Sequence, residues 1–508
     1  MHIDVIDTSM YIEYCCGVDE SRRLLRTGSR PTEWSDQLAM DTLENIDRQS
    51  HLHPFTNVAE GRPAAHIIER AHGVWIFDRA GRAYLDALAG LWCVNVGYGN
   101  PHIVDAISQA SSRLSFAHNF MGVGNEAAIR LSDRLIGLSR VRMCKAFFGN
   151  SGSDANDTNL KLARLFHMLS SGVHRTKFIA RRGGYHGTTL ATSSLSGLSV
   201  FHRSFGLPES TYLHISAPDI YTALNGASFS SEEQYADSLV AELEEIILRE
   251  EPETIAAFVA EPVMAVGGIL AAPRTYFAKV KQVLDKYGIL LIIDDVVCSF
   301  GRLGHWFGWE TIGVVPDLVS IAKGLTSGYI PMSASIIGDR VWHAISQHAG
   351  QIGTLGHGFT TSGHPVAAAA ALANIDVIEG NCLLNAAKSS GEDILSALRQ
   401  ELSSHPLVTD IRGVGLLIGV ELAADRTILD RYPGAGGLAA TVATACLARG
   451  LIVRALPGRD VIAFSPPLNI SESERGMVIE RFIKALGDVT GDRGRDGKDL
   501  GHKNAAGL

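Results

Sequence analysis

The chain has 508 residues, of which 46% are hydrophobic and 19% are charged, a balance typical of a folded globular protein rather than a disordered one. Acidic residues outnumber basic ones by 54 to 45, which gives a net charge of -9 at pH 7. Because proteins that bind nucleic acids are usually basic, we expect no nucleic-acid partner. No apolar stretch is long enough to cross a bilayer, so we expect no membrane partner either.

The N-terminus lacks the basic segment and the apolar core of a secretory signal peptide. The seven cysteines are irregularly spaced and contain no Cys-x-x-Cys pair, which argues against a disulfide framework and against a zinc site. We therefore expect a cytoplasmic protein without a bound metal. Residues 1–35 show no hydrophobic period, and we expect them to form a mobile N-terminal extension.

The next part of the chain predicts a large domain preceded by a short segment. Residues 36–85 contain a predicted hairpin, whose two strands flank an Asp–Arg–Ala–Gly turn. Between residues 86 and 360, helical patterns alternate with apolar runs of strand length. This alternation predicts a mostly parallel sheet that is covered by helices on both faces. The runs are at 177–181, 254–260, 288–294 and 317–322.

Residues 361–487 predict a smaller α+β domain, to which the segment 36–85 also belongs. A helix follows Pro365, a pair of strands surrounds a glycine turn at 408–423, and further strands follow. Residues 488–508 are rich in glycine and charge, and we expect a mobile tail there. The predicted fold class is therefore α/β, with a large domain and a smaller α+β domain.

Asp294 and Lys323 each follow an apolar strand, at the end where open α/β sheets bind ligands. A buried carboxylate is costly unless a cation or a hydrogen-bond donor meets it. Burial of a lysine is equally costly and lowers its pKa. Taken alone, this pattern is explained as well by a structural role as by a ligand site. The structural role would be an ion pair or two loop residues that cap helices.

A Gly/Ser turn precedes a predicted helix at residues 150–153, and the N–H groups at such a helix start bind phosphate. Gly152 lets the backbone come close to a ligand, and Ser153 adds a hydroxyl. Ordinary helix capping by Ser153 or Asp154 is the commoner use of such a turn.

Three further segments carry weaker signals, namely 183–189, 260–268 and 357–365. The first contains an aromatic ring and an imidazole, the second a carboxylate at a strand end, and the third a group of hydroxyls. Together, a phosphate-binding turn, an aromatic ring, a strand-end aspartate and a strand-end lysine describe a site for pyridoxal phosphate. In such a site a lysine amine binds the cofactor aldehyde covalently, and an aspartate keeps the pyridine nitrogen protonated.

Four longer strings stand out at residues 51–57, 89–100, 293–304 and 357–365. Through them, residues 50–485 resemble the class III pyridoxal-phosphate aminotransferases of fold type I. The branch most similar to them is that of the omega-amino acid:pyruvate and (S)-selective amine:pyruvate transaminases. The resemblance rests on HLHPFTN (51–57), AGLWCVNVGYGN (89–100), IDDVVCSFGRLG (293–304) and HGFTTSGHP (357–365). It implies an enzyme that moves an amino group from an amine or an omega-amino acid to a keto acid such as pyruvate.

The resemblance also implies roles for single residues. Lys323, Asp294 and Tyr185 would be catalytic. Thr360 would reach the phosphate held by a neighbouring subunit, so a homodimer or a dimer of dimers with shared active sites is expected. The cofactor-binding set would be Gly152, Ser153, Tyr185, His186, Glu261, Asp294, Val296, Lys323 and Thr360. The substrate-binding set would be Phe55, Trp92, Phe120 and Arg454, with Arg459 as a rival for the role of Arg454.

The sequence departs from this branch around the substrate pocket. Asp154 and Asp295 stand where glutamate is usual, and residues 264–266 replace the usual Gln-Gly-Ala. Ala117 and Thr361 stand where bulkier aromatic residues are common. The substrate therefore stays open. The alternatives are a diaminopelargonate-type or ornithine-type aminotransferase, an aminomutase or a decarboxylase of the same fold, and a cofactor-binding protein without turnover.

Overall fold

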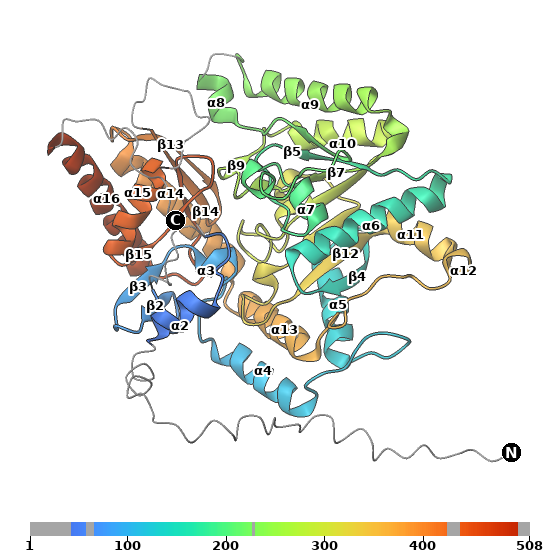
Figure 1. Ribbon diagram of the computed structural model, residues 1–508, viewed down its shortest axis with the longest axis horizontal. Helices are drawn as coiled ribbons and strands as arrows, with labels where there is room; N and C mark the ends of the chain where they lie inside the picture. Colours follow the sequence, from blue (N-terminus) through green and yellow to red (C-terminus); the bar gives the residue numbers. More distant parts are fainter. Residues whose placement is uncertain (1–41, 57–65, 226–228, 424–436, 496–508) are drawn as a thin grey trace, which may run out of the picture. The chain divides into compact units, whose positions relative to one another are not determined.

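The computed structural model describes residues 42–56, 66–225, 229–423 and 437–495, which fall into two units (Figure 1). The N-terminal unit ends at Ile67 and the main unit begins at Ile68. In the N-terminal unit, helix α2 (Leu43–Ser50) begins after Thr42, whose hydroxyl accepts a hydrogen bond from the N–H of Asn45. The predicted extension 1–35 lies outside the described residues.

The main unit is built on a seven-stranded sheet with the order β4-β12-β11-β10-β7-β5-β6. Strands β11, β10, β7, β5 and β6 run parallel, whereas β12 is antiparallel to both of its neighbours, β11 and β4. This confirms the predicted, mostly parallel sheet. The strands are β4 (Met143–Gly149), β12 (Ser333–Gly338), β11 (Leu318–Ile321), β10 (Leu290–Asp294), β7 (Ile255–Ala260), β5 (Lys177–Arg181) and β6 (Tyr212–Ile215).

Helices cover both faces of this sheet, so its central strands are buried along their whole length. Alternate residues of one strand therefore enter different cores: Ile292 packs on the face of α6 and α11, and Leu291 packs on the opposite face. Burial on both faces explains why these strands are continuous apolar runs. The helices are α6 (Gly152–Ser171) and α11 (Asp339–Gln347) on one face, and α5 (Glu126–Ser139), α9 (Glu232–Arg249), α10 (Tyr276–Tyr287) and α13 (Pro365–Gly380) on the other.

Two smaller four-stranded sheets complete the main unit, and the first of them joins early and late parts of the chain. The predicted hairpin forms as β2 (Trp75–Asp78) and β3 (Ala83–Asp86), and β3 pairs in parallel with β15 (Leu451–Ile452). The other sheet is antiparallel with the order β13-β14-β17-β16. The strands of this second sheet are β13 (Val408–Val414), β14 (Leu417–Leu422), β17 (Val461–Phe464) and β16 (Arg454–Ala455). Strand β1 (Ile68–His72) pairs with β2 in the first sheet. Strands β8 (Val263–Met264) and β9 (Leu270–Ala271) pair with each other.

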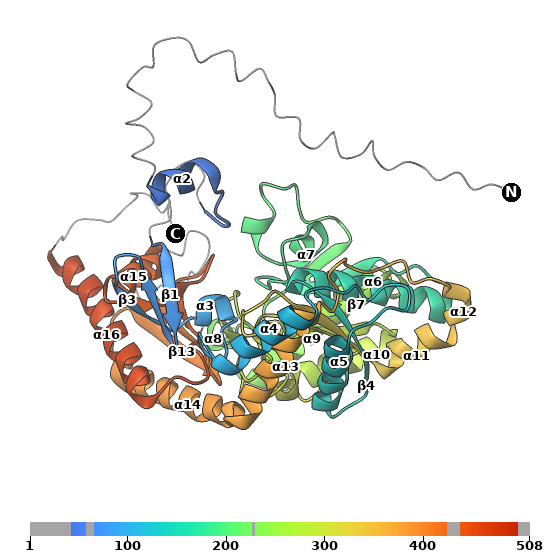
Figure 2. The same ribbon diagram turned by 90° about the horizontal axis from the view of Figure 1, so that it is seen from below.

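Helices α14 (Leu383–Leu402), α15 (Gly437–Ala448) and α16 (Glu472–Arg495) pack around the second small sheet and against one another, as Figure 2 shows for α14 and α16. Helix α13 packs against α4 (Pro101–Arg113) and α5, although the predicted boundary at 360 assigns it to the smaller domain. The remaining helices are α3 (Ala89–Trp92), α7 (Leu190–Leu195), α8 (Ile220–Asn225) and α12 (Ala349–Ile352).

Helix α16 extends to Arg495, so the start of the predicted mobile tail at residue 488 is wrong. Val489 is buried and continues the apolar face of Phe482, Ala485 and Leu486 by another helical turn. The glycine and charge content of the tail concealed this period. Residues 496–508 lie outside the described residues.

Within the described ranges, no single helix is both long enough and apolar enough to span a membrane. Only α13 and α14 taken together, across a bend of 64°, reach the required length and composition.

Candidate active site

Asp294 and Lys323 lie at the same edge of the main sheet. Asp294 is the last residue of β10, and Lys323 follows the last residue of β11 by two positions. The two strands are parallel neighbours, with Asp294 opposite Ser320. The structure thus places both residues at the carboxyl ends of adjacent strands, where open α/β sheets bind ligands.

The Asp294 carboxylate is buried and receives three hydrogen bonds. Its Oδ2 accepts from Nδ1 of His186 at 2.8 Å and from Nδ2 of Asn156 at 2.8 Å, and its Oδ1 accepts from the N–H of Val296 at 3.2 Å. Three donors thus fix the orientation of the Asp294 carboxylate. No ion pair joins Asp294 to Lys323 in the described part of the chain, so the alternative of a structural pair between them is wrong.

Asn156 extends this network beneath helix α6. Its Oδ1 accepts from the hydroxyl of Ser320 at 2.6 Å, and that hydroxyl oxygen accepts from Nδ2 of Asn159 at 2.7 Å. Oδ1 of Asn159 accepts in turn from the hydroxyl of Ser335. Asn156 and Asn159 are residues of this network that the sequence did not predict. The available signal was the pair of amides on a helix face that otherwise packs on apolar strands.

At the start of α6, different residues cap the helix and offer groups to a ligand. Ser151 is the N-cap: its hydroxyl accepts from the N–H of Asp154, and the Asp154 carboxylate accepts from the N–H of Ser151. Ser153 does not cap the helix, and its hydroxyl oxygen accepts from the N–H of Thr188 at 3.1 Å. The N–H groups of Gly152 and Ser153 form no hydrogen bond within the described residues. They are the free donors that a phosphate needs.

Gly152 and Val296 are in close contact. A Cβ atom at position 152 would lie 3.1 Å from both Cγ atoms of Val296, which is closer than ordinary packing allows. The missing side chain at residue 152 therefore lets the helix start approach the segment after β10 without displacing Val296. This close approach brings the free N–H groups of α6 and the end of β10 to one site.

Tyr185 and Glu261 are joined through the backbone. Oε1 of Glu261 accepts from the N–H of Tyr185 at 3.3 Å, and Oε2 accepts from the N–H of Ala265 at 2.9 Å. Burial raises the pKa of Glu261. Burial, together with the charge of Asp294, also raises the pKa of Tyr185. Glu261 was assigned to the cofactor-binding set, and its bonds to the N–H groups of Tyr185 and Ala265 fix the loop that carries Tyr185 and His186.

The Lys323 amine forms no hydrogen bond or ion pair within the described ranges. Its removal from water lowers its pKa, against the opposing effect of the Asp294 charge, and Arg454 lowers that pKa further. Lys323 also has a positive φ of 39°, which is uncommon for a residue other than glycine. Strained backbone of this kind occurs at functional sites, where the surrounding structure holds it.

Arg454 lies over the buried ring of Trp92, with its guanidinium carbon 4.7 Å from the ring centroid. It forms no ion pair with any described residue, and burial lowers its pKa. Arg459 is different, because its Nη2 lies 2.8 Å from Asp219 and 3.1 Å from Glu421. Burial alone would lower the pKa of Arg459, but these two carboxylates raise it. Arg459 is thus occupied, and Arg454 is available to a ligand.

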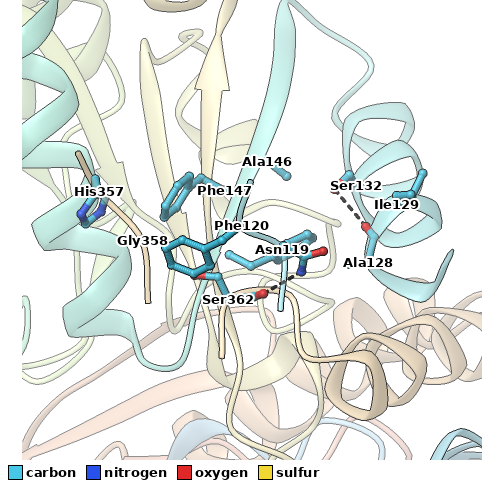
Figure 3. A pocket seen from close by; sticks show the side chains of 11 residues that line it. Asn119, Phe120, Ala128, Ile129, Ser132, Ala146, Phe147, His357, Gly358 and Ser362 are labelled. Carbon is cyan, nitrogen blue, oxygen red and sulfur yellow. Dashed lines mark hydrogen bonds between the residues drawn. The ribbon is translucent and has the colours of Figure 1, made fainter. Parts of the chain in front are cut away.

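Phe120 lines a separate cavity of about 270 Å³ between β4, α5 and the segment 357–362 (Figure 3). The residues that line this cavity include neither Asp294 nor Lys323, so a single chain does not bring Phe120 to the strand-end site. Thr360 is exposed close to this cavity. Phe55 belongs to the N-terminal unit, and its predicted role stays a prediction.

One group of side chains in the N-terminal unit has the composition of a metal site. Donor atoms of Asp47, His51 and His53 lie within 4.8 Å of one another. Nε2 of His53 is 2.8 Å from Oδ1 of Asp47, and Nδ1 of His51 is 3.4 Å from the same oxygen. Contacts between imidazole and carboxylate account for this group without an ion.

The comparisons with known proteins agree with the geometry. Residues 57–486 match the family described as aminotransferase class-III. The diaminobutyrate–2-oxoglutarate transaminase of Halomonas elongata is 38% identical over 92% of this chain and 99% of its own length. The putrescine–pyruvate aminotransferase of Pseudomonas aeruginosa is 37% identical over 91% of this chain and 97% of its own. The omega transaminase of Pseudomonas jessenii in complex with PMP is 42% identical, with a TM-score of 0.84, over 89% of this chain and 99% of that structure.

Proposed function

Because the chain belongs to the class III aminotransferases, which use pyridoxal phosphate, we propose that it transfers an amino group from an amine or an omega-amino acid to pyruvate. The choice of amine and of keto acid is the proposed part. One observation carries it: a half-buried arginine, Arg454, has no carboxylate partner within the described residues and lies on the indole of Trp92.

Arg454 supports a pocket that serves two kinds of substrate. A keto acid brings a carboxylate, which an arginine binds through two parallel hydrogen bonds. An amine donor without a carboxylate brings only apolar surface. In that case the guanidinium keeps its cation–π contact with Trp92, a contact worth about 0.5–2 kcal/mol. The same side chain can thus bind one substrate and stay clear of the other.

The occupied arginines favour pyruvate over a dicarboxylate such as 2-oxoglutarate. A second carboxylate would need a second cation. Arg459 is held by Asp219 and Glu421, and Nη1 of Arg412 lies 2.6 Å from both Asp410 and Glu421. Among these arginines, only Arg454 is left for a substrate.

The groups at the start of α6 and at the strand ends fit the cofactor. Gly152 and Ser153 offer free N–H groups to its phosphate, and Asp294 keeps room on Oδ1 for the pyridine N–H. We assign Tyr185 and Val296 to the two faces of the ring, and Lys323 to the covalent link. The bound cofactor supplies an electron sink. The lowered pKa of Lys323 favours the neutral amine, which can take a proton from the substrate carbon and return it.

The proposal includes a homodimer with shared active sites. Apolar side chains are exposed between α4 and α5, with Met121 92% and Phe120 38% accessible, and Ile129 at the start of α5 is 65% accessible. A contiguous exposed patch of this kind indicates a protein interface. Thr360, exposed beside it, would then reach the phosphate of the partner. Sedimentation of the holoenzyme tests this, and an active monomer would contradict it.

The cytoplasm is the proposed location. The five described cysteines, Cys93, Cys144, Cys298, Cys382 and Cys446, are all free, as is usual in a reducing compartment. Cell fractionation followed by detection of the chain tests this location.

A panel of amine donors against keto-acid acceptors tests the function. We expect an amine to bleach the absorbance of the bound cofactor, and pyruvate to restore it faster than 2-oxoglutarate does. Recovery with 2-oxoglutarate alone would overturn the proposed acceptor and leave the family assignment intact.

A further inference from the structure

His357 connects helix α6 to the segment that carries Thr360. Its Nε2 lies 2.8 Å from the hydroxyl of Thr158, and its Nδ1 lies 2.9 Å from Nζ of Lys161. Its ring stacks on Phe147 of β4, with centroids 5.0 Å apart and an angle of 12° between the planes. Figure 3 shows His357 and Phe147 side by side at the rim of the cavity.

These contacts require a neutral imidazole. The Lys161 ammonium can only donate, so Nδ1 of His357 must accept. The hydroxyl of Thr158 donates to the carbonyl of Asp154 at 2.7 Å, so its oxygen accepts from the Nε2–H of His357. Protonation of Nδ1 would remove the acceptor that Lys161 uses and would place two cations next to each other.

The segment is fastened to α6 on both sides of Thr360. His357 contacts the second turn of the helix, and the hydroxyl of Thr361 donates to Oδ1 of Asn150, just before the helix, at 2.6 Å. Thr360 lies exposed between these two anchors. The helix whose first turn offers N–H groups to one phosphate thus also holds the segment assigned to the phosphate of the neighbouring subunit.

We propose that His357 is a positioning residue that holds Thr360 in place for the partner's cofactor only while its imidazole is neutral. This inference rests on the proposed function, because it needs a dimer in which Thr360 contacts the phosphate. It adds that cofactor retention falls in mild acid.

The sign of the pH effect follows from the surroundings of His357. Among the described neighbours, Lys161 is the charged group that faces it, and Thr158, Phe147 and Phe359 are uncharged. Burial and then the charge of Lys161 lower the pKa of His357 in the attached state. The detached histidine regains a pKa of about 6.5. Attachment is therefore complete above about pH 6.5 and weakens as the pH falls below it.

The test is the rate at which the holoenzyme loses its cofactor in buffer free of pyridoxal phosphate, at pH 8 and at pH 5.5. His357→Phe keeps the ring stack and removes both hydrogen bonds. We expect it to lose the cofactor about ten-fold faster than wild type at pH 8, the effect of about two ordinary hydrogen bonds. The rate of cofactor loss from this variant should rise little further at pH 5.5. The exposed His174 provides the control, because His174→Gln should keep the wild-type rates at both pH values.

Lys161→Met is a second variant at an exposed position that should leave folding intact. Without the neighbouring ammonium, the pKa of attached His357 moves towards its ordinary value, so the acid effect should shrink. Wild-type rates and a wild-type pH profile in both variants would overturn the inference. Failure of the wild-type chain to bind pyridoxal phosphate or to form a dimer would instead contradict the proposed function.

Discussion

Asn156 donates from one amide nitrogen to Oδ2 of Asp294 and to the carbonyl of His186, at 2.8 Å each. The carboxylate assigned to the pyridine nitrogen is therefore oriented by helix α6 as well as by the strand that carries it. The other end of the Asn156 amide is bonded to Ser320, on the neighbouring strand. Asn156 thus sets the position of Asp294 between two strands and a helix.

Asn156→Ala removes the amide donor of Asp294 and leaves the Ser320 hydroxyl without its acceptor. We expect a loss of about 1–3 kcal/mol in the free energy of unfolding, the usual cost of unsatisfied buried groups. Weaker binding of pyridoxal phosphate should accompany it. Thermal unfolding and cofactor titration measure the two effects. Asn385→Ala, at an exposed position of α14, is the control that should change neither.

Arg454→Gln should impair the half-reaction with pyruvate far more than the half-reaction with an arylalkyl amine. The lost charge-assisted contact is worth about 1.5–3 kcal/mol, or roughly 10- to 150-fold in rate or affinity. Single-turnover spectroscopy resolves the two half-reactions. Equal losses in both would remove Arg454 from the role of carboxylate receptor.

Arg459→Gln separates the two arginines. It leaves the half-buried carboxylate of Asp219 without Arg459, and it leaves the buried Glu421 with Arg412 as its arginine partner among the described residues. Breaking a buried ion pair from one side costs about 3–5 kcal/mol, so we expect a lower midpoint in thermal unfolding. The variant should keep the ratio of the two half-reaction rates. A selective loss with pyruvate would assign Arg459 to the substrate after all.

Lys323→Ala should abolish turnover, because the covalent link and the proton-carrying amine are lost together. Borohydride reduction of the wild-type holoenzyme should attach the cofactor to the peptide that contains Lys323. Mapping that peptide by mass spectrometry checks the assignment, and a label on another lysine would refute it. Because the pKa of Lys323 is lowered, its amine should stay neutral and reactive at pH values where an exposed lysine is already protonated.

Gly152→Ala places a methyl group 3.1 Å from both Cγ atoms of Val296. We expect a loss of about 1 kcal/mol in stability, the low end of the range for overpacking, and weaker cofactor binding because the helix start is displaced. Val296→Ala removes both Cγ atoms and so relieves the close contact. The double variant should therefore bind pyridoxal phosphate more tightly than the sum of the two single-variant losses in binding free energy implies. Additive losses would show that the two residues do not set each other's position.

The sequence predicted those features that depend on local pattern. Strand β5 occupies residues 177–181 as expected, and the continuous apolar runs correctly indicated burial on both faces of the sheet. Asp294 and Lys323 could be placed at one edge because parallel neighbours end on the same side. Ser151 was not recognised as the N-cap, because Ser151, Ser153 and Asp154 offer equivalent caps until the backbone angles are known.

The features that the sequence could not predict are those that tertiary contacts decide. Asn156 bonds with residues 30 and 138 positions away in the chain, and no local period reveals such partners. The same holds for Arg454 and Arg459, five positions apart, of which only Arg459 meets carboxylates. Phe120 was assigned to the substrate pocket by resemblance; within one chain it lines the separate cavity between β4 and α5, and its role in the pocket stays a prediction.

Helix α6 also sets a length. Gly152, at its first position, is assigned to the phosphate, and Asn156, four residues later, is bonded to Asp294, which is assigned to the pyridine nitrogen. At a rise of 1.5 Å per residue, the two are separated by about 6 Å along a rigid element. On these assignments the helix fixes the distance between the two ends of the proposed cofactor site, and residues 264–266 and Arg454 lie outside the helix. Substitutions there can change which amine is accepted without altering the dimensions that retain the cofactor.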